Sequence, residues 1–255
     1  MVESFSNFFL NIVVILFAMW MGGLATTIYG RIPNDIPLGP SHKPMCDHCG
    51  TEIKFKYFFP IIGYIISKGK CVKCDNKIPR VYLYLEIAIT IFVLLIALQF
   101  DFRGDIFFDE RFITKSILGA YLITLLFIYN THKQIKVRLI WMLLTFIILY
   151  LGYNNLLPNF IDLFISVVAS YTAFFFVSKT IQLEKNENVM CVTLLSCCGK
   201  IIPIIFFAVA TVLFYFYHVS KKNNLKRINT IMTHLSAHHI IVVPIIVQMI
   251  MLFVK

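Results

Sequence analysis

The chain has 255 residues, of which 59% are hydrophobic, 15% aromatic and only 14% charged. Soluble domains carry roughly 45–50% apolar and about 25% charged residues, so this composition excludes an ordinary soluble domain. The 25 Phe and 12 Tyr also exclude a disordered chain. A net charge of +10 could suggest a nucleic acid partner, but the basic residues lie between apolar segments, not on a soluble face, so no nucleic acid partner is expected.

Long apolar segments recur along the chain, each close to the ~20 residues with which a helix crosses a bilayer. They cover residues 5–29, 82–100, 113–129, 139–153, 159–178, 201–219 and 231–254. Helices are expected, because barrel strands would alternate polar and apolar residues over about ten positions. Basic residues on both sides of 188–220 call for a further, short crossing at 190–198.

We therefore expect an all-α polytopic membrane protein with seven to eight transmembrane helices. Residues 1–29 form the first helix, which is retained because its start lacks the basic residues of a signal peptide. Residues 30–81 contain nine Lys and Arg, which predicts a cytoplasmic loop domain. Residues 82–255 form a multi-helix membrane domain.

Four of the seven cysteines form two Cys-x-x-Cys pairs in the loop, at Cys46 and Cys49 and at Cys71 and Cys74. Two such pairs offer four thiolates to a tetrahedral Zn²⁺ ion, and nearby Lys and Arg would lower the thiol pKa values. A disulfide or redox role and unliganded thiols are the alternatives, although a cytosolic loop is reducing. His48 is a possible further ligand, but a plain loop histidine is the simpler interpretation.

The segment 57–67, between the two pairs, is too short to span a membrane and too apolar for a solvated loop. We expect it to lie on the membrane interface or to dip into it.

A longer pattern runs from Gly23 to Glu86 and includes both cysteine pairs. Its residues are Gly23, Tyr29-Gly30-Arg31-Ile32-Pro33, Ser41, Pro44, Cys46, Cys49, Gly50, Phe59-Pro60-Ile61, Gly63, Tyr64, Gly69, Cys71, Cys74, Ile78 and Glu86. In order and spacing this pattern resembles the type IV prepilin peptidases, which are intramembrane aspartic proteases of the GxGD type that also methylate the new N-terminus. The resemblance implies an aspartic-type endopeptidase fold of the A24 type and a location in the bacterial inner membrane.

The resemblance also implies two catalytic aspartates, and it places Tyr129 and Cys191 at their positions. An aspartic protease needs two carboxyls that share a proton, and a tyrosine with a reference pKa of about 10 cannot be the base near neutral pH. No catalytic residue is therefore assigned, and the chain has the features of a pseudoenzyme.

Other residues could replace the lost acids. Cys191 could act as a nucleophile if a histidine of the last span were its base, but a Cys in an apolar segment is more often a packing residue. We count Asp162 as the only acid inside a predicted span, and its place near the outer interface indicates a structural role. Glutamates near Cys191 have no evident partner. The residues concerned are Asp162, Glu184, Glu187, Cys191, His234, His238 and His239.

The leading interpretation is a prepilin peptidase-like protein of a type IV pilus or type II secretion system that is proteolytically impaired. It would act as a pilin-binding or assembly factor, or persist as a degenerate remnant. The alternative is an active leader peptidase and N-methyltransferase that uses carboxylates misplaced in this alignment. By resemblance, the partners are membrane lipid and prepilins or pseudopilins, and S-adenosylmethionine is a possible cofactor.

Overall fold

A computed structural model describes residues 2–38, 44–46, 48–100, 109–132 and 135–153, together with residues 164, 167–168, 170–172, 242, 245–250 and 252–253. The chain divides into two compact units, Met1–Ile128 and Tyr129–Lys255. In the described ranges the named elements are all helices, and the only β-structure there consists of two isolated bridges. The expected all-α class is confirmed for this part of the chain.

Three described helices are long and apolar enough to cross a membrane. They are α1 (Val2–Arg31), α4 (Arg80–Ala97) and α5 (Glu110–His132). A fourth, α6 (Val137–Tyr153), is apolar but shorter. These four correspond to the first four expected segments, and they show a multi-pass membrane protein.

The remaining expected crossings, from residue 159 onward, fall largely outside the described residues. The total of seven to eight helices therefore stays a prediction.

Proline fixes the ends of the loop that joins α1 to α4. Helix α1 ends at Arg31, because Pro33 disfavours the helical conformation at the preceding Ile32. Helix α4 begins at Arg80, directly after Pro79, whose backbone is extended. Both helices thus have a basic residue at the end that meets the loop.

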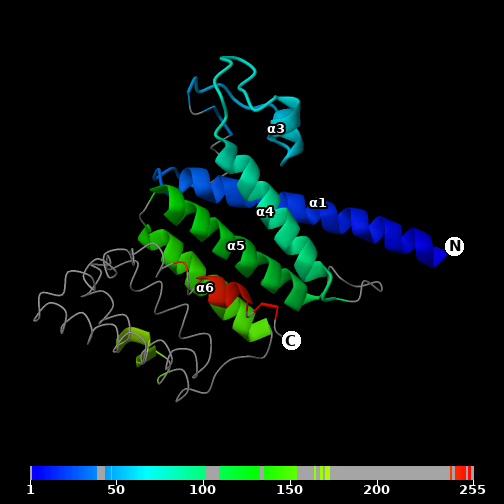
Figure 1. The fold of residues 1–255 in the computed structure, drawn as a ribbon, viewed down its shortest axis with the longest axis vertical. Helices are drawn as coiled ribbons and strands as arrows, with labels where there is room; N and C mark the ends of the chain where they lie inside the picture. The colour runs from blue at the N-terminus through cyan, green and yellow to red at the C-terminus, as the bar shows by residue number, and fades with distance from the viewer. Residues whose placement is uncertain are drawn as a thin grey trace, which may run out of the picture. The chain divides into compact units, whose positions relative to one another are not determined.

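Helices α1 and α4 pack against one another, and Figure 1 shows α4 running across α1. The buried face of α1 is made partly of small residues, with Ala18 and Ala25 fully or almost fully buried. Small side chains let two membrane helices approach closely, and dispersion contacts then hold them together. Near the loop, the rings of Tyr29 and Tyr82 meet edge to face with centroids 5.5 Å apart.

Helix α5 adds a third layer to the first unit. Its Phe112 ring lies 5.8 Å from the ring of Phe17 and 5.7 Å from that of Phe100. Farther along, Gly119 lies directly against the ring of Phe92 in α4, so closely that no side chain fits there. In α5, 78% of the apolar window is buried, against 33% and 39% in α1 and α4, so α5 is the most enclosed of the three.

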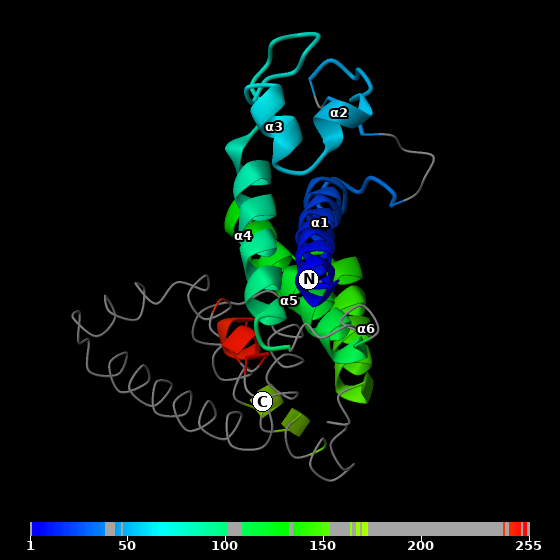
Figure 2. The same ribbon diagram turned by 90° about the vertical axis from the view of Figure 1, so that its right-hand side faces the viewer.

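The loop between α1 and α4 contains two short helices, α2 (Phe55–Phe58) and α3 (Ile62–Ile66), which pack against each other. Figure 2 shows them beside the loop ends of α1 and α4, with the cysteine-bearing turns beyond them. The loop therefore has a structure of its own, and the four cysteines lie within it.

Candidate metal centre

The first Cys-x-x-Cys pair lies in a tight turn. The N–H of Gly50 donates to the carbonyl of Cys46 at 2.9 Å, and the N–H of Cys46 donates to the carbonyl of Thr51 at 2.9 Å. Gly50 has a φ of 65°, which glycine adopts without steric cost. An antiparallel bridge between Met45 and Glu52 closes the turn.

The second pair repeats this turn bond for bond. The N–H of Asp75 donates to the carbonyl of Cys71, and the N–H of Cys71 donates to the carbonyl of Asn76, both at 2.9 Å. Asp75 has a φ of 56°, and a Lys70–Lys77 bridge closes this turn. The two Cys-x-x-Cys pairs therefore share one backbone structure.

The two turns bring four sulfur atoms together, all within 4.8 Å of one another. The Sγ atoms of Cys46 and Cys74 are 3.9 Å apart, and so are those of Cys49 and Cys71. Four thiolates about 2.3 Å from one tetrahedral zinc ion would be about 3.8 Å apart, so the cluster could hold such an ion. The separations are nearly twice a disulfide bond of about 2.05 Å.

Hydrogen bonds and the crowding of the thiols set their acidity. The Thr51 hydroxyl, 3.3 Å from Cys49 Sγ, and the Thr51 backbone N–H lower the pKa of Cys49 to about 6. Backbone N–H groups of Cys74 and Lys73 lower the pKa of Cys71. A backbone bond from Asn76 also favours the Cys74 thiolate, but burial and the other thiols outweigh it and raise the pKa of Cys74 to about 12.

These causes differ from the expected one. We anticipated that nearby Lys and Arg would lower the thiol pKa values, but the dominant causes are hydrogen bonds made within the turns. The opposite shifts show that ionisation of some thiols makes ionisation of the last one harder. A divalent cation among the sulfurs would remove this conflict, because metal binding requires all ligands to be deprotonated.

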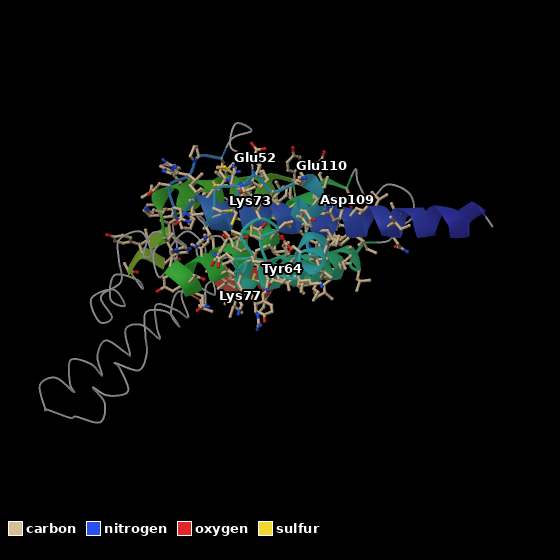
Figure 3. All side chains as sticks on the ribbon, turned by 90° about the horizontal axis from the view of Figure 1, so that it is seen from above. Glu52, Tyr64, Lys73, Lys77, Asp109 and Glu110 are labelled. Atoms are coloured by element: carbon tan, nitrogen blue, oxygen red, sulfur yellow. The ribbon has the colours of Figure 1, made fainter. Side chains whose placement is uncertain are left out.

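The surroundings of the cluster are polar and open to solvent. Figure 3, viewed from above, labels Glu52 of the first turn and Lys73 and Lys77 of the second, and all three side chains are exposed. His48 is exposed too, and among the described residues the ligand group contains the four cysteines and no histidine.

The expected catalytic positions are only partly visible. Tyr129 lies in the last turn of α5 and is buried, with 4% of its surface exposed. Cys191 lies outside the described residues, so the structure does not bring the two positions together or separate them. The alternative candidates Asp162, Glu184, Glu187, His234, His238 and His239 also lie outside the described residues.

Sequence reasoning named Glu86 as part of the family pattern but assigned it no role and did not count it among the intramembrane acids. Glu86 lies within α4, a candidate span, so the expectation that Asp162 is the only acid inside a span is wrong. Its carboxylate Oε2 accepts the backbone N–H of Ile61 at 2.7 Å, and the Thr26 side chain also interacts with the carboxyl. A carboxyl in an otherwise apolar helix is itself a signal of a specific role, and that signal could have identified Glu86.

The segment of the chain that matches a known protein family contains all four cysteines. Residues 16–100 match the family described as the bacterial peptidase A24 N-terminal domain. Over 75 residues, the chain is 29% identical to a prepilin leader peptidase/N-methyltransferase of Vibrio cholerae, a match that covers 27% of this chain and 30% of that protein. Over 101 residues, it is 26% identical to the type 4 prepilin-like proteins leader peptide-processing enzyme of Escherichia coli, covering 38% of this chain and 36% of that enzyme.

The matched stretch thus spans about a third of the length of these curated relatives. No solved structure matches the chain. The family match includes α1 from residue 16 onward, both cysteine pairs and α4, which are the elements that form and support the cluster. Residues 16–100, which contain the four cysteines, therefore form a domain of the bacterial peptidase A24 N-terminal type.

Proposed function

We propose that this protein is a prepilin peptidase-like protein of a bacterial inner membrane whose cytoplasmic loop binds one zinc ion through Cys46, Cys49, Cys71 and Cys74. The observation that carries this proposal is the four-sulfur cluster, whose separations fit a tetrahedral site. Four thiolates fill every position of such a site and leave none for water or substrate. The ion would therefore be structural, and its binding would stabilise the fold of the loop.

The proposal includes impaired proteolysis. The family pattern places Tyr129 and Cys191 at the positions of the two catalytic aspartates. A buried phenol cannot accept a proton from water near neutral pH, and a single carboxyl cannot replace a pair that shares one proton. Glu86 offers one carboxyl in the membrane, and that group is already engaged with the backbone of Ile61.

A chain that does not cleave prepilins would still use its loop domain for binding. It would bind prepilins or pseudopilins of a type IV pilus or type II secretion system, as a pilin-binding or assembly factor. The substrates named for its relatives have a leader peptide, so the expected ligand is the leader together with the apolar segment that follows it. A degenerate remnant would bind no such peptide.

The second candidate is an active leader peptidase and N-methyltransferase. The Vibrio cholerae relative has both activities in its name, and S-adenosylmethionine would be the methyl donor. In this case carboxylates other than those at positions 129 and 191 would supply the acid pair. Glu86 is the described intramembrane acid that favours keeping this candidate.

Cleavage of a prepilin by the purified full chain in detergent distinguishes the two candidates. We expect the labelled prepilin to be retained on the protein but not cut, while the Vibrio cholerae relative cuts it under the same conditions. Efficient cleavage by the unmodified chain would contradict impaired proteolysis, and transfer of a labelled methyl group to a precut pilin would establish the methyltransferase.

A gain-of-function variant tests the residue assignment itself. If Tyr129 and Cys191 stand at the acid positions, the double substitution Tyr129→Asp and Cys191→Asp should restore cleavage, and either single substitution should not. General acid–base catalysis contributes typically 10²–10⁴-fold, which is ample to detect. A double variant that binds prepilin but stays inactive would contradict the assignment.

A further inference from the structure

The turn between α2 and α3 lies beside the membrane helices, well inside their ends. A Cβ atom added to Gly23 of α1 would be only 2.9 Å from the Cγ of Pro60, so the proline rests directly on that glycine. Gly23 is about two helical turns, or about 12 Å, from the loop end of α1 at Arg31. Glu86, which binds Ile61, is about 9 Å from the loop end of α4 at Arg80.

The backbone of this turn is strained. Ile61 has a φ of 62° and a ψ of −55°, and the N–H of Ile62 donates to the carbonyl of Pro60 at 2.6 Å. This is a γ-turn with positive φ, which is rare, and a β-branched residue adopts it only where the surroundings hold it. The contacts with Glu86 and Gly23 are the ones that hold it here.

The backbone N–H groups of Ile61, Ile62 and Gly63 are nevertheless all satisfied within the protein. Pro60 has no N–H, Ile61 donates to Glu86, and Gly63 donates to the carbonyl of Phe59 at 2.7 Å. Non-helical backbone occurs at membrane depth only when its polar groups are paired in this way. Among these bonds, the one to Glu86 is the only one made by a side chain.

The helix that follows the turn exposes large apolar side chains. Ile62, Ile65 and Ile66 of α3 are 42%, 65% and 54% exposed. Helix α3 has five residues, which is far too few to span a bilayer. Its exposed apolar surface therefore does not belong to a transmembrane helix. The turn that precedes α3 contacts both α1 and α4, which are themselves candidate membrane spans.

Exposed lysines flank this apolar hairpin on both sides. Lys54 directly precedes α2, Lys68 and Lys70 follow α3, and Lys56 lies inside α2 near the start of the hairpin. Long lysine side chains near the ends of a membrane segment extend their charge to the headgroups while the apolar part lies deeper. The charge pattern fits a bilayer surface as the occupant of this face.

From these contacts, we propose that residues 55–66 form a re-entrant hairpin embedded in one leaflet of the bilayer. Glu86 is the positioning residue that keeps it there, because its carboxylate accepts the N–H of the strained Ile61. The hairpin thereby ties the cysteine-bearing turns to the membrane helices.

Tryptophan fluorescence in reconstituted vesicles tests this proposal. The chain has two tryptophans, so Trp20→Phe and Trp141→Phe leave a background without them. Into this background we would introduce Ile65→Trp or, as a matched control, Val72→Trp, since both side chains are 65% exposed but Val72 lies between two cysteines. The vesicles contain phosphatidylcholine brominated at shallow acyl positions.

Emission from the Ile65→Trp variant should be quenched several-fold more strongly than emission from the Val72→Trp variant. Equal, weak quenching in both would overturn the proposal. Adding Glu86→Ala to the Ile65→Trp variant should reduce its quenching toward the control, whereas Glu86→Gln, whose amide oxygen can still accept the N–H, should preserve it.

A second substitution tests the position of the hairpin without changing the charge of Glu86. Gly23→Leu should also reduce quenching of the Ile65→Trp variant, because the larger side chain displaces Pro60 from α1. Bound metal per chain, measured on the same samples, reports whether the loop still folds. Unchanged quenching in both Glu86→Ala and Gly23→Leu would show that these contacts do not position the hairpin.

Discussion

Replacement of Gly50 by alanine isolates the contribution of backbone conformation to the metal centre. Gly50 has a φ of 65°, and a Cβ atom at this position would meet nothing within 4 Å. The substitution therefore introduces no clash, and its cost is that of placing an alanine in the left-handed region, about 1–2 kcal/mol. In the proposed zinc site, folding of the loop is coupled to metal binding, so this cost reduces the free energy of zinc binding.

A change of 1.4 kcal/mol is tenfold in a dissociation constant, so Gly50→Ala should weaken zinc binding by about 5- to 30-fold. The assay is competition with a chromophoric chelator, on the full chain in detergent. Gly152→Ala is the control, because Gly152 also has open space around it but lies in α6 without a positive φ. Equal zinc affinity of the Gly50→Ala variant and the unmodified chain would refute the reasoning.

The equivalent position in the second turn should respond differently. Asp75 already occupies the left-handed region with a φ of 56°, and aspartate tolerates that region better than alanine does. Asp75→Gly relieves this strain, but glycine loses about 0.5–1 kcal/mol more conformational entropy on folding, so the two effects largely offset each other. Zinc affinity should change by less than about threefold, and a loss as large as that of Gly50→Ala would contradict the equivalence of the two turns.

Three further outcomes follow from the contacts described. Cys49→Ser should abolish stoichiometric zinc binding while His48→Ala retains it, as measured by metal analysis, and unchanged zinc in the serine variant would exclude the cluster as the site. In metal-free protein at pH 7, iodoacetamide should modify Cys49 before Cys74, because a pKa of about 6 leaves the first mostly thiolate and one of about 12 leaves the second a thiol; mass spectrometry that finds the reverse order would contradict the assigned acidities. Gly119→Ala should destabilise the first unit by about 1–3 kcal/mol in thermal unfolding, because its methyl group would overlap the Phe92 ring, and an unchanged midpoint would show that the helices separate without cost.

The sequence predicted helices correctly where the apolar composition of a segment is enough to determine its secondary structure. The segment 82–100 was expected and Arg80–Ala97 is observed, since a run of apolar residues can satisfy its backbone in lipid only as a helix. The cysteine cluster was also predictable, because the ligand chemistry depends on residue type and spacing.

Features that depend on backbone conformation and long-range contacts were missed. The repeat of the two turns was hidden because Asp75 takes the position that Gly50 takes in the first turn, and the sequences then share little beyond the cysteines. The role of Glu86 was hidden because its partner is a backbone N–H in a strained turn far away in the chain. Neither strain nor a backbone partner has a signature in a single sequence.

X-ray absorption at the zinc edge, on full-length protein purified without added metal, tests the central claim most directly. We expect one zinc ion per chain with four sulfur ligands at about 2.3 Å. A protein without zinc, or a zinc ion bound mainly by nitrogen or oxygen, would contradict the assignment of the four cysteines as its ligands.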